Sequence, residues 1–217
     1  MTPTTRWIRR PILRLAILLS VAAIGCGSTA RETLQQGPIL DDASIAVINV
    51  TISPLSNLNS PFDDFGATMP LDTTYLYFTT GRDGRQRVVQ SRWTGSGWGS
   101  PTPAPAIDNG KDNGLPCITP DGNTLYLAGD EYGFGDCDLY RVEVGLRGAV
   151  PTEQMPWTIP SNLGSNVNTL YWDSHPCVAA DGSILYFSSD RAGGYGGRDI
   201  WYSRRRRDGS WDKPINA

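Results

Sequence analysis

The only histidine of the chain, His175, follows Asp173 by two residues and precedes Cys177 by two. An imidazole beside a carboxylate and a thiol is the kind of set that activates a nucleophile. However, no serine, threonine or cysteine lies on the strand–turn–helix pattern that presents such a nucleophile. Cys177 also has a counterpart, Cys117, in a second copy of the surrounding sequence. We therefore interpret Cys177 as a packed thiol and predict no catalytic residue.

Three acidic stretches with glycines in or near them could supply oxygen ligands to calcium: 63–64, 108–112 and 130–138. None has the spacing of an EF-hand loop, and acidic turns are commonly only solvated. A zinc site is not expected, because the chain has one histidine and no Cys-x-x-Cys pair. Calcium is the one cofactor that the sequence leaves open.

Four aromatic residues form a candidate binding surface: Tyr132, Phe134, Tyr195 and Trp172. The first three lie in expected loops, and loops on a rigid scaffold commonly carry binding residues. Aromatic side chains suit contacts with proteins or glycans. They also suit packing over a neighbouring element, so both interpretations stay open.

A repeat positions these residues. Residues 115–127 (LPCITPDGNTLYL) recur 60 positions later as 175–187 (HPCVAADGSILYF), and each copy precedes an acidic, glycine-rich loop and a short apolar strand. A weaker copy lies upstream at 69–78, where Asp72 is followed by Thr instead of Gly. Repeats of this length indicate one supersecondary unit per copy.

Each unit has the signals of four short antiparallel strands. Asp-Gly supplies the positive φ of a two-residue hairpin turn, and the runs beside it are aromatic and β-branched. Trp98, Trp157 and Trp211 each precede an expected fourth strand. The residues assigned to the structure of the repeat are Asp121, Gly122, Asp138, Asp181, Gly182, Asp199 and Trp201.

The sequence therefore predicts an all-β protein made of β-propeller blades. Four-stranded units that bury their apolar faces only against neighbouring units are typical of this fold. We expect about three blades, over residues 55–106, 107–164 and 165–217, in an incomplete or open propeller.

The stretch from Asp181 to Trp201 resembles the WD40-like β-propeller repeat of bacterial envelope proteins, which also occurs in the periplasmic propeller of the Tol system and beside OmpA-like domains. The resemblance implies a propeller fold and a role in protein–protein or envelope-scaffold binding. It carries no catalytic motif. Propellers of this family usually close with six or more blades, so we expect either a truncated chain or, as second interpretation, closure by association. Open blade edges would favour self-association.

The N-terminus has the pattern of an export signal. Four arginines precede the apolar run 15–24, which is too short to span a bilayer comfortably. The run ends in Ala23-Ile24-Gly25-Cys26, which resembles a bacterial lipobox. We expect a signal peptide over 1–25, lipidation of Cys26 and a tether with a lead-in strand over 26–54. The alternative is an ordinary signal peptide cleaved nearby. Either way the protein is expected to be exported, to the periplasmic or cell-surface side of the membrane.

Net charge and cysteine content limit the possible binding partners and disulfides. Removal of the signal peptide changes the formal net charge from −3 to −7, which argues against nucleic acid as a partner. Cys117, Cys137 and Cys177 remain besides Cys26, so an odd thiol is left over if one disulfide forms. A Cys117–Cys137 disulfide is conceivable, but the sequence does not determine the pairing.

Together these features favour a non-enzymatic binding or scaffolding module of the cell envelope, with a protein or an envelope polymer as its partner. The alternative is a propeller-type hydrolase or lyase acting on a glycan or peptide, with calcium as a conceivable cofactor. A sialidase-type Asp box is not matched around Asp121, because Asn123 and Leu125 stand where that motif has Gly and Thr.

Overall fold

A computed structural model describes residues 52–104, 107, 110–130, 133–143 and 157–217. The expected signal peptide, Cys26, most of the lead-in strand and Tyr132 lie outside the described residues. Within the described ranges, no helix has the length and apolar character needed to cross a membrane.

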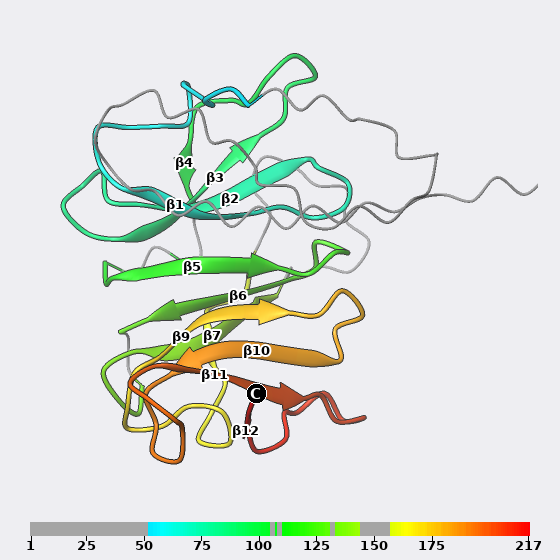
Figure 1. Ribbon diagram of the computed structural model, residues 1–217. Helices are drawn as coiled ribbons and strands as arrows, with labels where there is room; N and C mark the ends of the chain where they lie inside the picture. Colours follow the sequence, from blue (N-terminus) through cyan, green and yellow to red (C-terminus); the bar gives the residue numbers. More distant parts are fainter. Residues whose placement is uncertain (1–51, 105–106, 108–109, 131–132, 144–156) are drawn as a thin grey trace, which may run out of the picture.

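The prediction of an all-β protein with three four-stranded antiparallel blades is confirmed. Strands follow one another across each sheet in chain order, and the three sheets lie one after another in Figure 1. Blade 1 comprises β1 (Asp64–Thr68), β2 (Tyr75–Thr80), β3 (Arg87–Arg92) and β4 (Thr102–Pro103). Blade 2 comprises β5 (Asn113–Ile118), β6 (Thr124–Gly129), β7 (Asp138–Glu143) and β8 (Ser161–Asn162). Blade 3 comprises β9 (Asp173–Val178), β10 (Ile184–Ser189), β11 (Asp199–Arg204) and β12 (Ile215–Asn216).

The Asp-Gly turns are longer than the two-residue form predicted from the sequence. In blade 2 the Thr119 N–H donates to the Thr124 carbonyl at 2.8 Å, so the loop holds the four residues between them. Asp121 accepts the Asn123 N–H at 3.0 Å, and Gly122 has a φ of 71°. The two-residue prediction was wrong because the Asp side chain caps its own turn, which places the left-handed glycine one step later.

Blade 1 keeps this turn without the glycine. Thr73 occupies the glycine position and has a φ of 55°, while Asp72 accepts the Thr74 N–H at 3.0 Å. In blade 3, Gly182 has a φ of 72° beside the capping residue Asp181. The turn is therefore common to all three blades.

Apolar side chains fill the two interfaces between blades. Successive residues of a strand point to opposite faces, so in β6 Leu125 faces blade 1 and Tyr126 faces blade 3. The cluster between blades 1 and 2 contains Tyr75, Tyr77, Val88, Ala104, Ile107, Ile118, Leu125, Leu127, Tyr140, Val142 and Trp157. The cluster between blades 2 and 3 contains Tyr126, Ala128, Leu139, Val167, Leu185, Phe187, Trp201 and Trp211.

The first strands of blades 2 and 3 lie against the preceding blade: β5 contacts β1 and β2, and β9 contacts β5 and β6. We call β1, β5 and β9 the inner strands. Each has an irregular register at the same place, where Gly66, Leu115 and His175 have φ values of 65°, 54° and 56°. Left-handed backbone is costly for a residue with a Cβ. Its recurrence in all three inner strands shows that it belongs to the blade itself.

Candidate binding site on the inner strands

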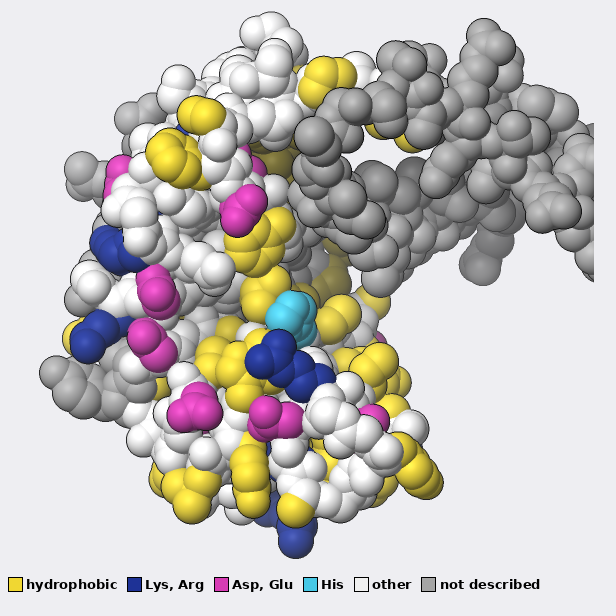
Figure 2. All heavy atoms as spheres, turned by 60° about the vertical axis from the view of Figure 1, so that its left-hand side comes forward, with side chains coloured by type: hydrophobic (Ala, Val, Ile, Leu, Met, Phe, Trp, Pro, Cys, Tyr) yellow, Lys and Arg dark blue, Asp and Glu magenta, His cyan; other side chains and the backbone are white. Residues whose placement is uncertain are grey.

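Three side chains meet at the start of blade 3. The Arg198 guanidinium carbon lies 3.7 Å from the centroid of the Trp172 ring, and the ring centroids of Trp172 and His175 are 5.4 Å apart. We call these three residues the inner-strand cluster. Figure 2 shows the histidine, in cyan, at the surface among apolar side chains with a basic side chain beside it. Guanidinium–indole contacts of this kind are attractive, so the cluster is held together without a metal or a disulfide.

The imidazole of the cluster is a neutral group near pH 7. Burial lowers the pKa of His175, and the positive charge of Arg198 lowers it further. A neutral imidazole offers one hydrogen-bond donor and one acceptor. The cluster therefore presents an aromatic face, a fixed cation and a neutral donor–acceptor at one place.

Asp173 is not a partner of His175. Its carboxylate is fully buried, with Oδ2 accepting the N–H and the hydroxyl of Thr169 at 2.6 and 2.8 Å and Oδ1 paired with Arg191 at 2.5 Å. The carboxylate of Asp190 is also engaged, because it accepts the backbone N–H of Trp172 at 2.9 Å. Both carboxylates bind structural donors, so neither is available to activate His175 as a base.

Asp138 holds the glycine-rich loop of blade 2. Its Oδ2 accepts the Phe134 N–H at 2.5 Å and the side-chain amide of Asn162 at 3.2 Å. Burial raises the pKa of Asp138, although these hydrogen bonds oppose the rise. A Cβ on Gly133 would overlap the carboxylate, so glycine is required for this close approach.

Asp199 holds the loop of blade 3 in the same way. Its Oδ2 accepts the N–H groups of Tyr195 and Gly196 at 2.8 and 3.2 Å, and a Cβ on Gly194 would overlap it. The aromatic residues that follow these glycines are thus presented by anchored loops.

The structure places three of the four predicted aromatic binding residues, and differently; Tyr132 lies outside the described residues. Trp172 is part of the cluster. Phe134 is 44% exposed, and its loop touches the segment before Trp172, since a Cβ on Gly135 would lie 2.5 Å from the Leu170 carbonyl carbon. Tyr195 is 94% exposed at the tip of the blade 3 loop.

Arg198 is not among the binding residues predicted from the sequence. A signal existed, because it stands immediately before the recurrent Asp199 where blade 2 has Cys137 before Asp138. A charged residue that replaces a small thiol within an otherwise faithful copy marks a departure from the repeat.

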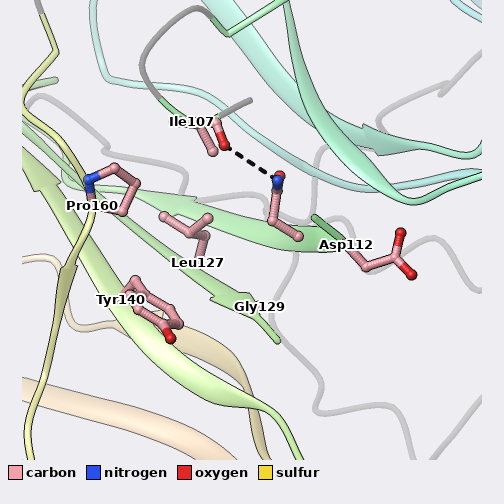
Figure 3. Close-up of a pocket in the computed structure, with 7 residues that line it drawn as sticks. Ile107, Asp112, Leu127, Gly129, Tyr140 and Pro160 are labelled. Atoms are coloured by element: carbon pink, nitrogen blue, oxygen red, sulfur yellow. Dashed lines mark hydrogen bonds between the residues drawn. The ribbon is translucent and has the colours of Figure 1, made fainter. Parts of the chain in front are cut away.

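A small cavity between blades 1 and 2 is no substrate site. Its volume is about 10 Å³, which is room for one water molecule. Figure 3 shows Leu127 and Tyr140 on one side and Ile107 on the other, with the Ile107 carbonyl accepting the Asn113 side-chain amide at 3.2 Å. Nowhere in the described ranges do three His, Cys, Asp or Glu residues gather as a metal site. Residues 108–109 and 131–132 of the predicted calcium stretches lie outside those ranges.

The three repeated four-stranded sheets define a β-propeller protein. No protein-family model and no curated protein sequence matches the chain. Similar solved structures include TolB from Acinetobacter baumannii (14% identity, TM-score 0.46, 72% of this chain and 33% of that one) and a putative TolB from Agrobacterium tumefaciens (19%, 0.48, 73% and 49%). An alpha-L-arabinofuranosidase from Lactobacillus brevis is also similar (12%, 0.46, 71% and 57%).

The chain spans about a third to a half of the length of the two TolB structures. At these identities the likeness concerns the fold alone.

Proposed function

We propose that this protein is a non-catalytic binding module of the bacterial cell envelope that captures a protein partner on its inner strands. The observation that carries the proposal is the inner-strand cluster, because all three of its members depart from the repeat. Where blade 3 has Trp172, His175 and Arg198, the equivalent positions of blade 2 hold Asp112, Leu115 and Cys137. Residues needed only for the blade would recur in its other copies.

The chemistry of the cluster favours a partner segment with a carboxylate beside an apolar side chain. Within the described residues Arg198 forms no ion pair, so its guanidinium retains donors for a carboxylate. The indole and imidazole beside it provide apolar contact and a hydrogen-bonding group. Trp and Arg are the residue types that most often dominate protein interfaces.

The proposal is tested by comparing variants of the full chain as bait for detergent-solubilised envelope proteins. Trp172→Ala and Arg198→Glu remove the cluster, and Trp93→Ala is the matched control because Trp93 is an exposed tryptophan on blade 1. We expect one envelope protein, identified by mass spectrometry, to bind the wild type and Trp93→Ala and to be lost from both cluster variants. Equal recovery on all baits contradicts the proposal.

A second arm uses purified peptidoglycan sacculi as the probe. If the wild type co-sediments with sacculi and the cluster variants do not, the partner is a polymer and the choice of a protein partner is wrong. A hydrolase or lyase is the alternative function. It is supported if the wild type, but not His175→Ala, cleaves the sacculi.

The envelope location rests on the N-terminal pattern. We propose that Cys26 is diacylated after removal of 1–25 and holds the propeller at the membrane through more than one acyl chain, which suffices for stable attachment. Mass spectrometry of the N-terminal peptide tests this. A mature chain that starts elsewhere with an unmodified Cys26 contradicts it.

We further propose that blade 3 binds a second copy of the chain. One face of its sheet is apolar and unpacked: Ile200 is 61% exposed, Ile215 55% and Tyr186 39%. We call these residues the open face. The residues equivalent to Ile200 in the other blades, Val88 and Leu139, are fully buried, because the next blade covers them.

The complementary surface lies on blade 1. Leu58 packs there on Leu76 and Phe78, while its counterparts Ile107 and Val167 lie inside the two interfaces between blades. The position of Leu58 is thus the one that meets an open face within the molecule, and Leu58 itself is 3% exposed. Head-to-tail contact between copies would repeat the interface that already joins the blades.

Light scattering during size exclusion tests the association. We expect the molar mass of the wild type to rise with concentration and that of Ile200→Asp to stay monomeric. Ile159→Asp is the control, since Ile159 is 84% exposed outside the open face. A monomeric wild type, or an unchanged Ile200→Asp, overturns the proposal.

A further inference from the structure

Two cysteines of neighbouring inner strands approach each other. Cys117 on β5 and Cys177 on β9 occupy equivalent positions of the repeat, each two residues after the left-handed residue of its strand. The Val178 N–H donates to the Cys117 sulfur at 3.3 Å, and the two thiols hydrogen-bond to each other. The Cys117 sulfur therefore lies against β9 beside the residue that follows Cys177, 60 positions along the chain.

Cys137 takes no part in this contact. It hydrogen-bonds to Ser174, and its strand position pairs with Trp172 across the interface. The intra-blade Cys117–Cys137 pairing that the sequence left open is thus not the pairing that the structure favours.

The two thiols differ in reactivity. Cys177 is exposed and Cys117 is half-buried. The hydrogen bond from Cys117 lowers the pKa of Cys177 to about 6, whereas the same bond and burial raise the pKa of Cys117. Because the thiolate is the attacking species in exchange reactions, Cys177 is the nucleophile of the pair and Cys117 resolves.

We propose that Cys117 and Cys177 form a disulfide that joins the inner strands of blades 2 and 3. The Cys177 thiolate attacks one sulfur of a low-molecular-mass or protein disulfide, forming a mixed disulfide and releasing one thiolate. Cys117 then loses its proton and attacks the Cys177 sulfur, which releases the second thiolate of the oxidant. Two protein thiols are oxidised by two electrons, and the oxidising disulfide is reduced to two thiols.

The bond would constrain the stack of blades at the interface that carries the inner-strand cluster. It closes a long loop of the unfolded chain, and such cross-links stabilise mainly by restricting that chain. The pairing rests on the geometry, whereas the oxidising compartment in which it forms rests on the proposed export.

The test uses the purified full chain, reduced and then exposed to oxidised glutathione. Free thiols are alkylated with iodoacetamide, and peptides are mapped by mass spectrometry without reduction. We expect a peptide linked through Cys117 and Cys177, with Cys137 alkylated. Cys137→Ser is the matched control and should keep the link. Cys117→Ser should instead retain glutathione on Cys177, because no resolving thiol remains.

Thermal unfolding provides a readout that does not depend on peptide recovery. A reductant should lower the Tm of the oxidised wild type and of Cys137→Ser by about 10 °C, and leave Cys117→Ser and Cys177→Ser unchanged. Alkylation of both Cys117 and Cys177 after oxidation, or a link through Cys137, overturns the proposal. A link that forms with glutathione but is absent from protein isolated from cells would contradict the export and leave the pairing intact.

Discussion

Arg191 and Asp173 form an ion pair with an Nη2–Oδ1 distance of 2.5 Å, in which the Arg side chain is 9% exposed and the Asp side chain fully buried. The same guanidinium donates to the Val167 carbonyl at 2.6 Å and lies over the Phe187 ring. In blade 1 the equivalent pair, Arg82 and Asp64, is separated by 3.4 Å. The Arg191–Asp173 pair ties β9 and the segment that enters it to the loop that follows β10.

Arg191→Met should lower the free energy of unfolding by about 3–5 kcal/mol, because it leaves the buried Asp173 carboxylate without its cation. Urea denaturation measures the change. Arg206→Met is the control: Arg206 and Asp212 are also 2.5 Å apart, but both are nearly half exposed, so the loss there should stay below about 1 kcal/mol. Equal losses would contradict the distinction.

Gly194→Ala should destabilise the protein by about 1–3 kcal/mol, since the added Cβ overlaps the Asp199 carboxylate and forces the loop to shift. Gly133→Ala should do the same through Asp138. The Tm from circular dichroism follows both. Gly197→Ala in the same loop has nothing within 4 Å and should leave the Tm unchanged.

Thr73→Gly should stabilise the protein by about 0.5–1 kcal/mol. The β-branched Thr73 is held at a φ of 55°, a strain that glycine does not have, although glycine also gains freedom in the unfolded chain. The reverse change at the equivalent turn, Gly122→Thr, should destabilise. A loss of stability in Thr73→Gly would show that the threonine side chain outweighs its backbone strain.

Asp64 should make stability depend on pH in the acid range. Burial raises its pKa, but hydrogen bonds from Ser60 and Thr80 outweigh burial and lower the pKa below 3.8. Its contribution is therefore complete above about pH 4 and is lost as the pH falls through the folded-state pKa.

As the pH is lowered from 4, the Tm of Asp64→Asn should accordingly fall less than that of the wild type. Asp138→Asn should behave in the opposite way. Since burial raises the pKa of Asp138, its contribution declines as the pH rises, and removing it should steepen the loss in acid. Parallel Tm–pH curves for all three proteins would count against both assignments.

Alkylation of the reduced protein should reveal the thiol pair. With a pKa of about 6, Cys177 should reach half of its maximal rate with iodoacetamide near pH 6. In Cys117→Ser this midpoint should move toward the ordinary thiol value of about 8.5. Cys137, whose pKa is raised to about 11 by burial, should react slowly at both pH 6 and pH 8.5. Mass spectrometry of each cysteine peptide measures these rates of alkylation.

Much of the fold could be predicted because its signals are local. The Asp-Gly signal at Asp121 and Gly122 and the alternation of Leu125 and Tyr126 recur in order along the chain, and strand pairing within a blade joins neighbouring segments. The sequence indicated where this turn lies but not its capped four-residue form. Even within a blade, the turn at Thr73 was not evident from the sequence, because the backbone forms it there without glycine. The local residue types do not report such a conformation.

The candidate site depended on the stacking of blades. Trp172 and His175 lie three residues apart at the start of β9, and Arg198 joins them from the position before β11. Cys117 reaches β9 only because β5 and β9 lie side by side with matched irregularities. By itself the sequence determined the unit, which has four strands, an Asp-containing turn and a glycine-rich loop, since these follow from residues within a few positions of one another. Only the tertiary structure decided which units touch, which thiols meet and which face stays open, because those outcomes follow from packing between distant segments.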